Sequence, residues 1–177
     1  MTQQQTKVVS LGFDLPQLQG LIGAVAASPE VGQTVWQAKT EWQRGFQSQA
    51  QIRNFTIPMD EPGALGGSDT APNMVEMVLG AYGCCLTTGY VMNAALQGIE
   101  LEGVEIAVEG DLDLQGFFGL APDVSPGYSA VRARVHLTAP KATEEELAAL
   151  HAQVTRTSPV GSILAQPVHL ATELDRG

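Results

Sequence analysis

Hydrophobic and polar positions change their spacing several times along the chain, and each change marks a predicted element. Apolar residues recur at helical spacing directly after Asp14-Leu-Pro, which supplies an N-cap residue and a proline for the first turn. This pattern predicts a helix over residues 15–27, within an N-terminal helical extension of residues 10–30. Residues 1–9 are polar, and we expect them to be flexible.

Alternating or β-branched apolar residues predict five strands. The first two precede the longest helix and are joined by a hairpin turn at Arg44-Gly45. In the fourth predicted strand, apolar residues alternate strictly with Arg132, Arg134 and His136. The predicted strands cover residues 34–44, 46–57, 104–110, 128–137 and 168–174.

The longest apolar segment, residues 77–96, carries no charge. Asn73 and Glu76 precede it at the spacing of a capping box, and the predicted helix ends near Gly98. Twenty such residues are long enough to cross a bilayer. However, glycines, threonines and an asparagine interrupt the segment, and neither Lys nor Arg flanks it, so a buried helix of a soluble protein is favoured.

Two further helices are predicted near the end of the chain. An acidic first turn after Thr143 opens a helix through about Thr155. Ser158-Pro159 then has the composition of an N-cap and first turn of a short helix. The order of the elements indicates one α+β domain over residues 1–177, with antiparallel strands.

Composition and net charge indicate the class of protein and argue against some classes of partner. The 177 residues are 44 % hydrophobic and 16 % charged, which is typical of one globular domain. The formal net charge of −10 argues against nucleic acid or an anionic membrane as a partner. Residues 21–27 are apolar but lack a preceding basic region, so a signal peptide is not predicted. No metal-site spacing or phosphate-binding glycine loop is present in the sequence, so we predict neither a metal nor a cofactor.

Both cysteines of the chain, Cys84 and Cys85, are adjacent in the long predicted helix. Their side chains then point about 100° apart, a geometry that prevents a disulfide bond between them. Without a disulfide framework, a reducing cytoplasm is the simplest compartment. The thiols either form a reactive centre or pack as small apolar residues, and the sequence chemistry leaves both possibilities open.

Several motifs taken together resemble the superfamily of osmotically inducible protein C and organic hydroperoxide resistance proteins (OsmC/Ohr-like). The resemblance runs from about Val35 to Leu174. It rests on these segments in order: Asp60-Glu-Pro, Leu65-Gly-Gly-Ser-Asp-Thr-Ala-Pro-Asn, Glu76, Gly83-Cys-Cys-Leu, Gly98-Ile-Glu-Leu, Val108-Glu-Gly-Asp-Leu-Asp and Ser158-Pro-Val. It implies an intertwined homodimer in which antiparallel sheets wrap around long, buried central helices.

The resemblance also implies site residues. Cys85 matches the family's reactive cysteine, and Cys84 stands where a small residue is usual. Ser158 stands where a second cysteine normally resolves the oxidised thiol. The family's assisting Glu falls at Val75, one residue before Glu76.

No arginine matches the family's assisting Arg cleanly. Pro58 falls near one placement, and Arg44 and Arg53 are the nearby candidates. The chain is closer to a branch with Glu at the Glu76 position and Ser-Pro-Val late in the sequence.

Two functions follow from the resemblance. In the first, Cys85 reduces an organic hydroperoxide, with Glu76 and either Arg44 or Arg53 assisting, and a thiol other than residue 158 resolves the sulfenic acid. That thiol is either an external reductant or Cys84 of the partner subunit. In the alternative, peroxidase chemistry is lost and the dimer binds a small apolar ligand at its interface.

Overall fold

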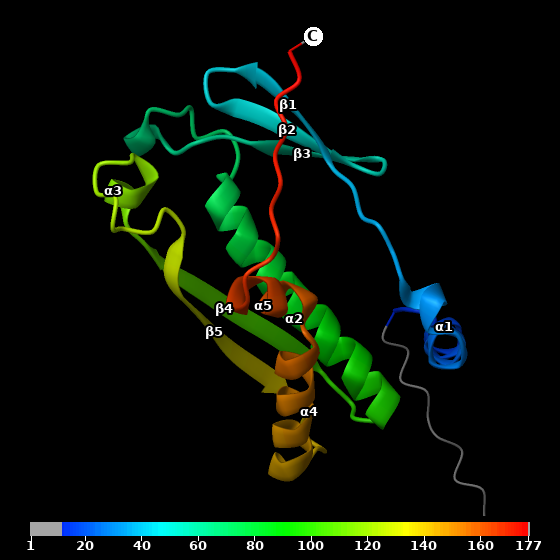
Figure 1. The fold of residues 1–177 in the computed structure, drawn as a ribbon. Helices are drawn as coiled ribbons and strands as arrows, with labels where there is room; N and C mark the ends of the chain where they lie inside the picture. Colours follow the sequence, from blue (N-terminus) through cyan, green and yellow to red (C-terminus); the bar gives the residue numbers. More distant parts are fainter. Residues whose placement is uncertain (1–11, 177) are drawn as a thin grey trace, which may run out of the picture. The chain divides into compact units, whose positions relative to one another are not determined.

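The computed structural model describes residues 12–176 and shows a mixed α+β chain with antiparallel sheets and a long central helix (Figure 1). The described chain forms two compact units, which meet in sequence between Gly80 and Ala81. The predicted flexible residues 1–9 lie outside the described residues, and the single domain stays a prediction.

The first unit begins with helix α1 (Leu15–Ala27), whose bounds confirm the sequence prediction. The Asp14 side chain accepts a hydrogen bond from the Gln17 amide at 2.9 Å, as expected of an N-cap residue. A 3₁₀ turn, η1 (Pro29–Gly32), follows, and no residue of α1 is buried.

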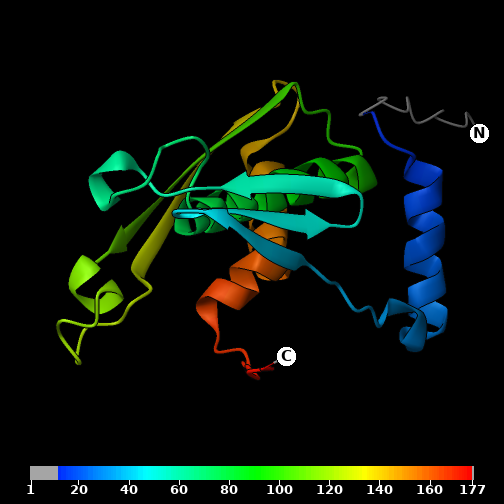
Figure 2. The same ribbon diagram turned by 90° about the horizontal axis from the view of Figure 1, so that it is seen from above.

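Three antiparallel strands follow in the order β1 (Lys39–Arg44), β2 (Gln47–Ile52) and β3 (Phe55–Met59) (Figure 2). The prediction of a strand from residue 34 was too long. The prediction of one strand over residues 46–57 was wrong, because Arg53 adopts φ 55° and the chain turns there. The three-residue step from Ile52 to Phe55 breaks the two-residue alternation of a strand, and this was the signal of the turn.

The loop after β3 is organised around the buried carboxylate of Asp60. This carboxylate accepts hydrogen bonds from the Glu61 amide (2.8 Å) and from the Thr70 amide (3.2 Å) and hydroxyl (2.8 Å). Burial raises the pKa of Asp60, but these bonds and one from the Ser68 amide outweigh it and lower the pKa to about 2. Asp60 therefore serves turn formation, as its place in a Gly- and Pro-rich loop suggests. The loop also contains the 3₁₀ turn η2 (Gly63–Leu65).

Helix α2 (Met74–Gln97) begins with the predicted capping box. The Glu76 amide donates to Asn73 Oδ1, and the Asn73 amide donates to Glu76 Oε2, both at 2.8 Å. Gly98, at φ 72°, ends the helix in the left-handed conformation. The helix is long and apolar enough to cross a membrane by length and composition alone.

The expected burial of α2 is only partial in the single chain. The buried residues are Leu86, Tyr90, Asn93 and Ala94. Near its start, Val75 and Val78 are exposed. Since the buried residues recur every three or four positions, α2 buries one face rather than its whole circumference.

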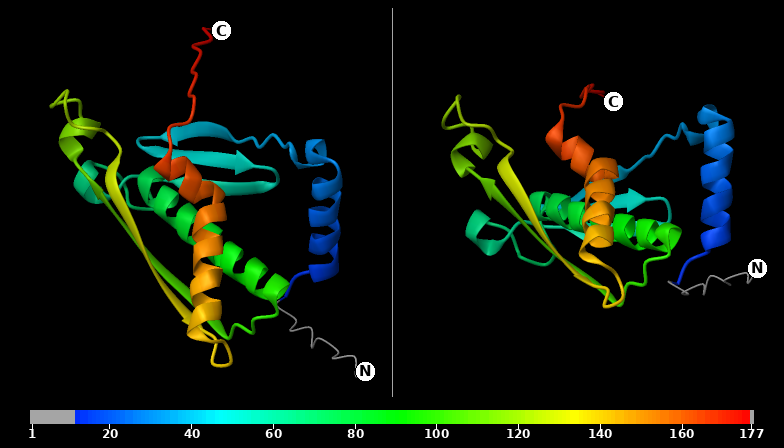
Figure 3. Two further views of the ribbon diagram at one scale, coloured as in Figure 1. Left: turned by 60° about the horizontal axis from the view of Figure 1, so that its bottom comes forward. Right: turned by 90° about the horizontal axis from the view of Figure 1, so that it is seen from below.

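The second unit packs helices on a two-stranded antiparallel sheet of β4 (Gly103–Leu112) and β5 (Tyr128–Thr138), joined through the short α3 (Leu114–Phe117). Helices α4 (Glu144–Thr157) and α5 (Pro159–Ala165) follow one another (Figure 3). The first turn of α4 is acidic, as predicted, and Thr143 and Glu146 form a capping box there. The buried core joins α2, α4 and the segments flanking the sheet: Leu86, Tyr90, Ala94, Ile99, Leu101, Ala139, Leu150 and Val154.

The predicted last strand over residues 168–174 is wrong. Residues 167–176 form neither helix nor strand. Val168 and Leu170 are exposed, so their side chains have no sheet face to pack against within the described chain. Alternating apolar residues stabilise a strand only where a neighbouring strand accepts its hydrogen bonds.

Candidate functional site

Cys85 and Ser158, 73 residues apart in sequence, meet in the second unit. The Cys85 sulfur lies 3.4 Å from the Ser158 hydroxyl oxygen. Cys85 is half-buried, and only 6 % of Ser158 is exposed. Figure 3 shows α2 passing the junction of α4 and α5, where Ser158 lies.

The junction of α4 and α5 fixes the position of Ser158. Ser158 ends α4 and is the N-cap of α5, where its hydroxyl oxygen accepts a hydrogen bond from the Gly161 amide at 3.1 Å. Pro159 in the first turn favours the helical conformation. Gly161 lies close to α2, because a Cβ atom at this position would be 3.2 Å from the Tyr82 ring. A Cβ at this position would thus require Ser158 or the Tyr82 ring to shift by a few tenths of an ångström.

A pocket of about 390 Å³ opens beside this contact. On α2, Cys85, Gly89 and Met92 follow one another at steps of four and three residues and so share one face of the helix. The lining is largely apolar and contains no Asp, Glu, Lys, Arg or His. Its residues are Cys85, Thr88, Gly89, Met92, Val154, Thr157, Ser158 and Pro159.

Gly89 and Val154 set the spacing of the two helices that line the pocket. A Cβ atom on Gly89 would lie only 2.9 Å from a Val154 methyl carbon. The sequence analysis did not identify Gly89 or the residues of α4 as part of a site. The helical spacing of Val154, Thr157 and Ser158 was the available signal.

Cys84 is exposed, whereas Cys85 is half-buried. Both thiols are free, as expected for neighbours on a regular helix. Cys84 does not line the Cys85 pocket. Cys84 and Cys85 therefore differ in environment although they are adjacent in sequence.

The carboxylate of Glu76 is bound at the start of α2, where it completes the capping box. Nine residues separate Glu76 from Cys85, which corresponds to about 13 Å of rise along a helix. The structure therefore gives Glu76 a capping role and no contact with the thiol.

Arg44 and Arg53 belong to the first unit, whereas Cys85 belongs to the second. Arg44 donates a hydrogen bond to the Gln47 side chain at 2.9 Å. The Arg53 guanidinium lies over the Phe55 ring, 5.1 Å from its centroid. Both arginines thus have partners within their own sheet, and their role at Cys85 stays a prediction.

Tyr90 and His151 form a second polar contact in this unit, which the sequence analysis did not find. The buried Tyr90 hydroxyl is hydrogen-bonded to His151 Nδ1, and the two rings are stacked with centroids 6.1 Å apart. Burial raises the pKa of Tyr90, and the nearby Tyr82 raises it further. The contact links α2 to α4 next to the pocket.

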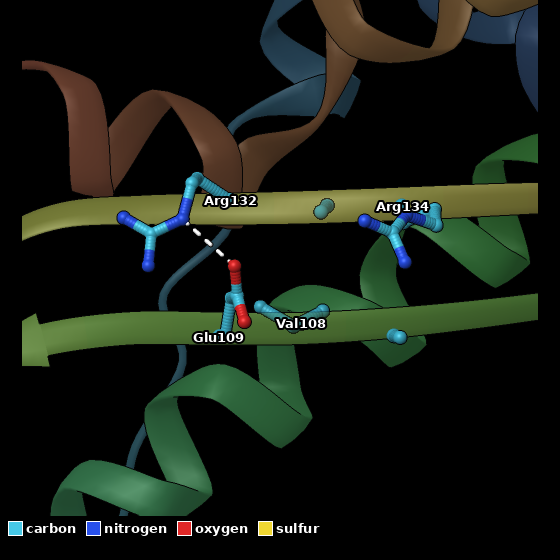
Figure 4. A pocket seen from close by; sticks show the side chains of 6 residues that line it. Val108, Glu109, Arg132 and Arg134 are labelled. Carbon is cyan, nitrogen blue, oxygen red and sulfur yellow. Dashed lines mark hydrogen bonds and ion pairs between the residues drawn. The ribbon is translucent and has the colours of Figure 1, made fainter.

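On the basic face of β5, Arg132 is paired with acidic residues of β4. Arg132 donates a hydrogen bond to Glu109 across the sheet (Figure 4). Arg132 also donates hydrogen bonds to Asp111, and these lower the pKa of that carboxyl. Arg134 lies further along β5 and lines the same surface hollow. Because Arg132 is paired with carboxylates, its contacts favour a solvated strand face over an anion-binding site here. Among residues 12–176 no group of three or more Cys, His, Asp or Glu side chains could hold a metal ion.

The family model described as "OsmC-like protein" matches residues 66–173. This chain belongs to the OsmC-like family. The match spans the Asp60 loop's second half, α2 with Cys85, the β4–β5 sheet and the α4–α5 junction with Ser158. No curated protein matches the chain.

Solved structures show the same fold at low sequence identity. An OsmC-like protein from Mycoplasma pneumoniae is 14 % identical with a TM-score of 0.64, over 75 % of this chain and 88 % of that one. The organic hydroperoxide resistance protein OsmC from Legionella pneumophila is 19 % identical with a TM-score of 0.55, over 75 % and 91 %. An organic hydroperoxide resistance protein from Elizabethkingia anophelis is 15 % identical with a TM-score of 0.51, over 73 % and 89 %.

Proposed function

We propose that this OsmC-like protein reduces organic hydroperoxides through Cys85, with an external thiol in place of a resolving cysteine. The observation that carries the proposal is the position of the Cys85 sulfur, which lines a largely apolar pocket of about 390 Å³. Several solved structures of similar fold are named organic hydroperoxide resistance proteins, which supports this class of substrate.

The first step transfers one oxygen atom to the thiolate. The Cys85 sulfur attacks the terminal oxygen of the hydroperoxide, an S–O bond forms, and the O–O bond breaks. The leaving alkoxide takes a proton and departs as an alcohol, and Cys85 becomes a sulfenic acid.

The second stage returns Cys85 to the thiol. Ser158 has no sulfur, so it cannot form a disulfide with Cys85. An external thiol attacks the sulfenic sulfur and water leaves, which gives a mixed disulfide. A second external thiol then releases Cys85 and carries away the disulfide. A reducing cytoplasm supplies such thiols and is the compartment that we propose.

A non-catalytic function is the alternative, in which the pocket binds a small apolar ligand and Cys85 only lines it. The absence of cationic side chains from the lining favours this alternative, because a nearby cation stabilises a thiolate. Arg44 and Arg53 are the candidates to supply this charge under the peroxidase proposal.

Turnover measurements separate the two functions. The purified protein is given dithiothreitol with either cumene hydroperoxide or hydrogen peroxide, and peroxide loss is followed. We expect faster loss of the apolar hydroperoxide, abolished by Cys85→Ser and retained by Cys84→Ser. Equal rates for the wild type and Cys85→Ser would contradict the peroxidase proposal. Binding of an apolar fluorescent probe without turnover would support the alternative.

A further inference from the structure

We propose that the Ser158 hydroxyl donates a hydrogen bond to the Cys85 thiolate and thereby activates it. The proposal rests on the proposed function, because an activated thiolate serves peroxide reduction. The hydrogen bond itself concerns only Cys85 and Ser158 and can be tested without a peroxide. Ser158 is then a positioning residue with two tasks, because the same side chain caps α5.

The hydrogen bonds of Ser158 leave its proton available. The hydroxyl oxygen accepts from the Gly161 amide at 3.1 Å, which uses one lone pair. The O–H group remains free to donate, and the Cys85 sulfur lies 3.4 Å away, within the range of hydrogen bonds to sulfur. Only 6 % of Ser158 is exposed, so water competes poorly for this proton.

The contact favours the charged form of Cys85. With a neutral thiol, either group can donate the hydrogen bond. A thiolate has no proton, so the hydroxyl must donate, and a hydrogen bond to a charged acceptor is roughly twice as strong as one between neutral groups. A contact that strengthens on deprotonation shifts the equilibrium toward the thiolate.

Few other titratable groups lie close enough to the pocket to stabilise or repel the Cys85 thiolate. The lining contains no titratable side chain besides Cys85. Of the titratable groups nearest to it along α2 and α4, His151 is bound to Tyr90, and Arg156 donates to the Gln153 side chain. The others are Tyr82 and Cys84 on α2, and α5 has none. The Ser158 hydroxyl is therefore the polar donor that the structure places at the sulfur.

The test measures the rate at which iodoacetamide alkylates Cys85 as a function of pH, in a Cys84→Ser background so that one thiol reports. Ser158→Gly removes the hydroxyl while glycine remains a tolerated N-cap residue. Ser158→Asp keeps an acceptor for the Gly161 amide but replaces the donor by a carboxylate. Ser158→Thr retains both the hydroxyl and the cap.

We expect Ser158→Gly to alkylate about tenfold more slowly at neutral pH, with its pH profile displaced upward by about one unit. Ser158→Asp is slower still, because its charge repels the thiolate, and Ser158→Thr stays within about twofold of the parent. Thr143→Gly, at the other end of α4, is the matched control for a lost cap and leaves the profile unchanged.

Parent-like alkylation of folded Ser158→Gly or Ser158→Asp would overturn the proposal. Aspartate is a strong N-cap residue, so parent-like alkylation of Ser158→Asp still overturns the proposal if Ser158→Gly does not fold. Slower alkylation of Ser158→Asp supports the contact between the two positions, and the role of the hydroxyl itself is shown by the difference between Ser158→Gly and Ser158→Thr. The readout needs no hydroperoxide. A protein that fails to consume hydroperoxide but shows the predicted alkylation differences would refute the proposed function and support the role of Ser158.

Discussion

At the scale of single residues, the chemistry of the second unit depends on what stands at position 158. A hydroxyl there caps α5 and contacts the Cys85 sulfur at 3.4 Å, but it cannot complete a disulfide. The sequence predicted the cap from Ser158-Pro159. The contact itself joins residues far apart in the chain, and only the packing of α5 on α2 brings them together.

Ser158→Cys is predicted to restore an internal resolving thiol. The sulfur of the new side chain would start close to Cys85, and a small rotation would bring the two sulfurs to bonding distance, about 2.05 Å. After one equivalent of hydroperoxide, peptide mapping without reductant should show a disulfide between Cys85 and the introduced thiol. Free thiols at both Cys85 and the introduced cysteine after this treatment would contradict the geometry of the contact.

Asp60 gives the first unit a pH dependence. Its pKa is lowered to about 2 in the folded protein, so the ionised carboxylate stabilises the fold above about pH 4. This contribution is lost as the pH falls from about 4 to about 2. Thermal melting of Asp60→Asn should show a lower midpoint at pH 7 and a smaller loss between pH 4 and pH 2 than the wild type. Parallel pH curves for the two proteins would contradict the role of the carboxylate.

At the scale of elements, the loop after β3 depends on close backbone packing at Gly67. A Cβ atom there would lie 1.7 Å from the Glu61 carbonyl oxygen, so the backbone must move. Gly67→Ala is predicted to destabilise the fold by at least about 2 kcal/mol, measured by urea unfolding. Gly63→Ala, in the same loop with no atom within 4 Å, is the matched control and should change stability by less than about 0.5 kcal/mol. Equal effects of the two substitutions would contradict this packing.

Elements with strong local signals could be predicted from the sequence, and those that depend on distant partners could not. The Asn73–Glu76 capping box and the helix at Asp14-Leu-Pro are local, and both are confirmed. The turn at Arg53 and the absence of a strand over residues 168–174 depend on pairing, which single-strand patterns do not specify. The pocket escaped prediction because the end of α4 and its junction with α5 together supply half of its lining.

At the scale of the whole molecule, exposed apolar side chains predict a partner. Large apolar residues are exposed in both units, among them Trp36 at 80 %, Trp42 at 75 % and Leu120 at 73 %. Surfaces of this kind usually mark sites of association. The homodimer expected from the family would bury such residues and more of α2.

Light scattering tests this association. We expect a mass of about twice the 18.7 kDa of the chain at micromolar concentration, without detergent. A mass equal to one chain would contradict the homodimer. Recovery of the protein only in detergent would indicate that a membrane covers α2 instead.

The most direct test of the peroxidase proposal is a search for a sulfenic acid on Cys85. Reduced Cys84→Ser protein is treated with one equivalent of cumene hydroperoxide and dimedone, and the adduct is located by peptide mass spectrometry. We predict one dimedone adduct on Cys85, and none in the double variant with Cys85→Ser. A free, unmodified Cys85 after excess hydroperoxide would contradict the proposal and leave the pocket as a binding site.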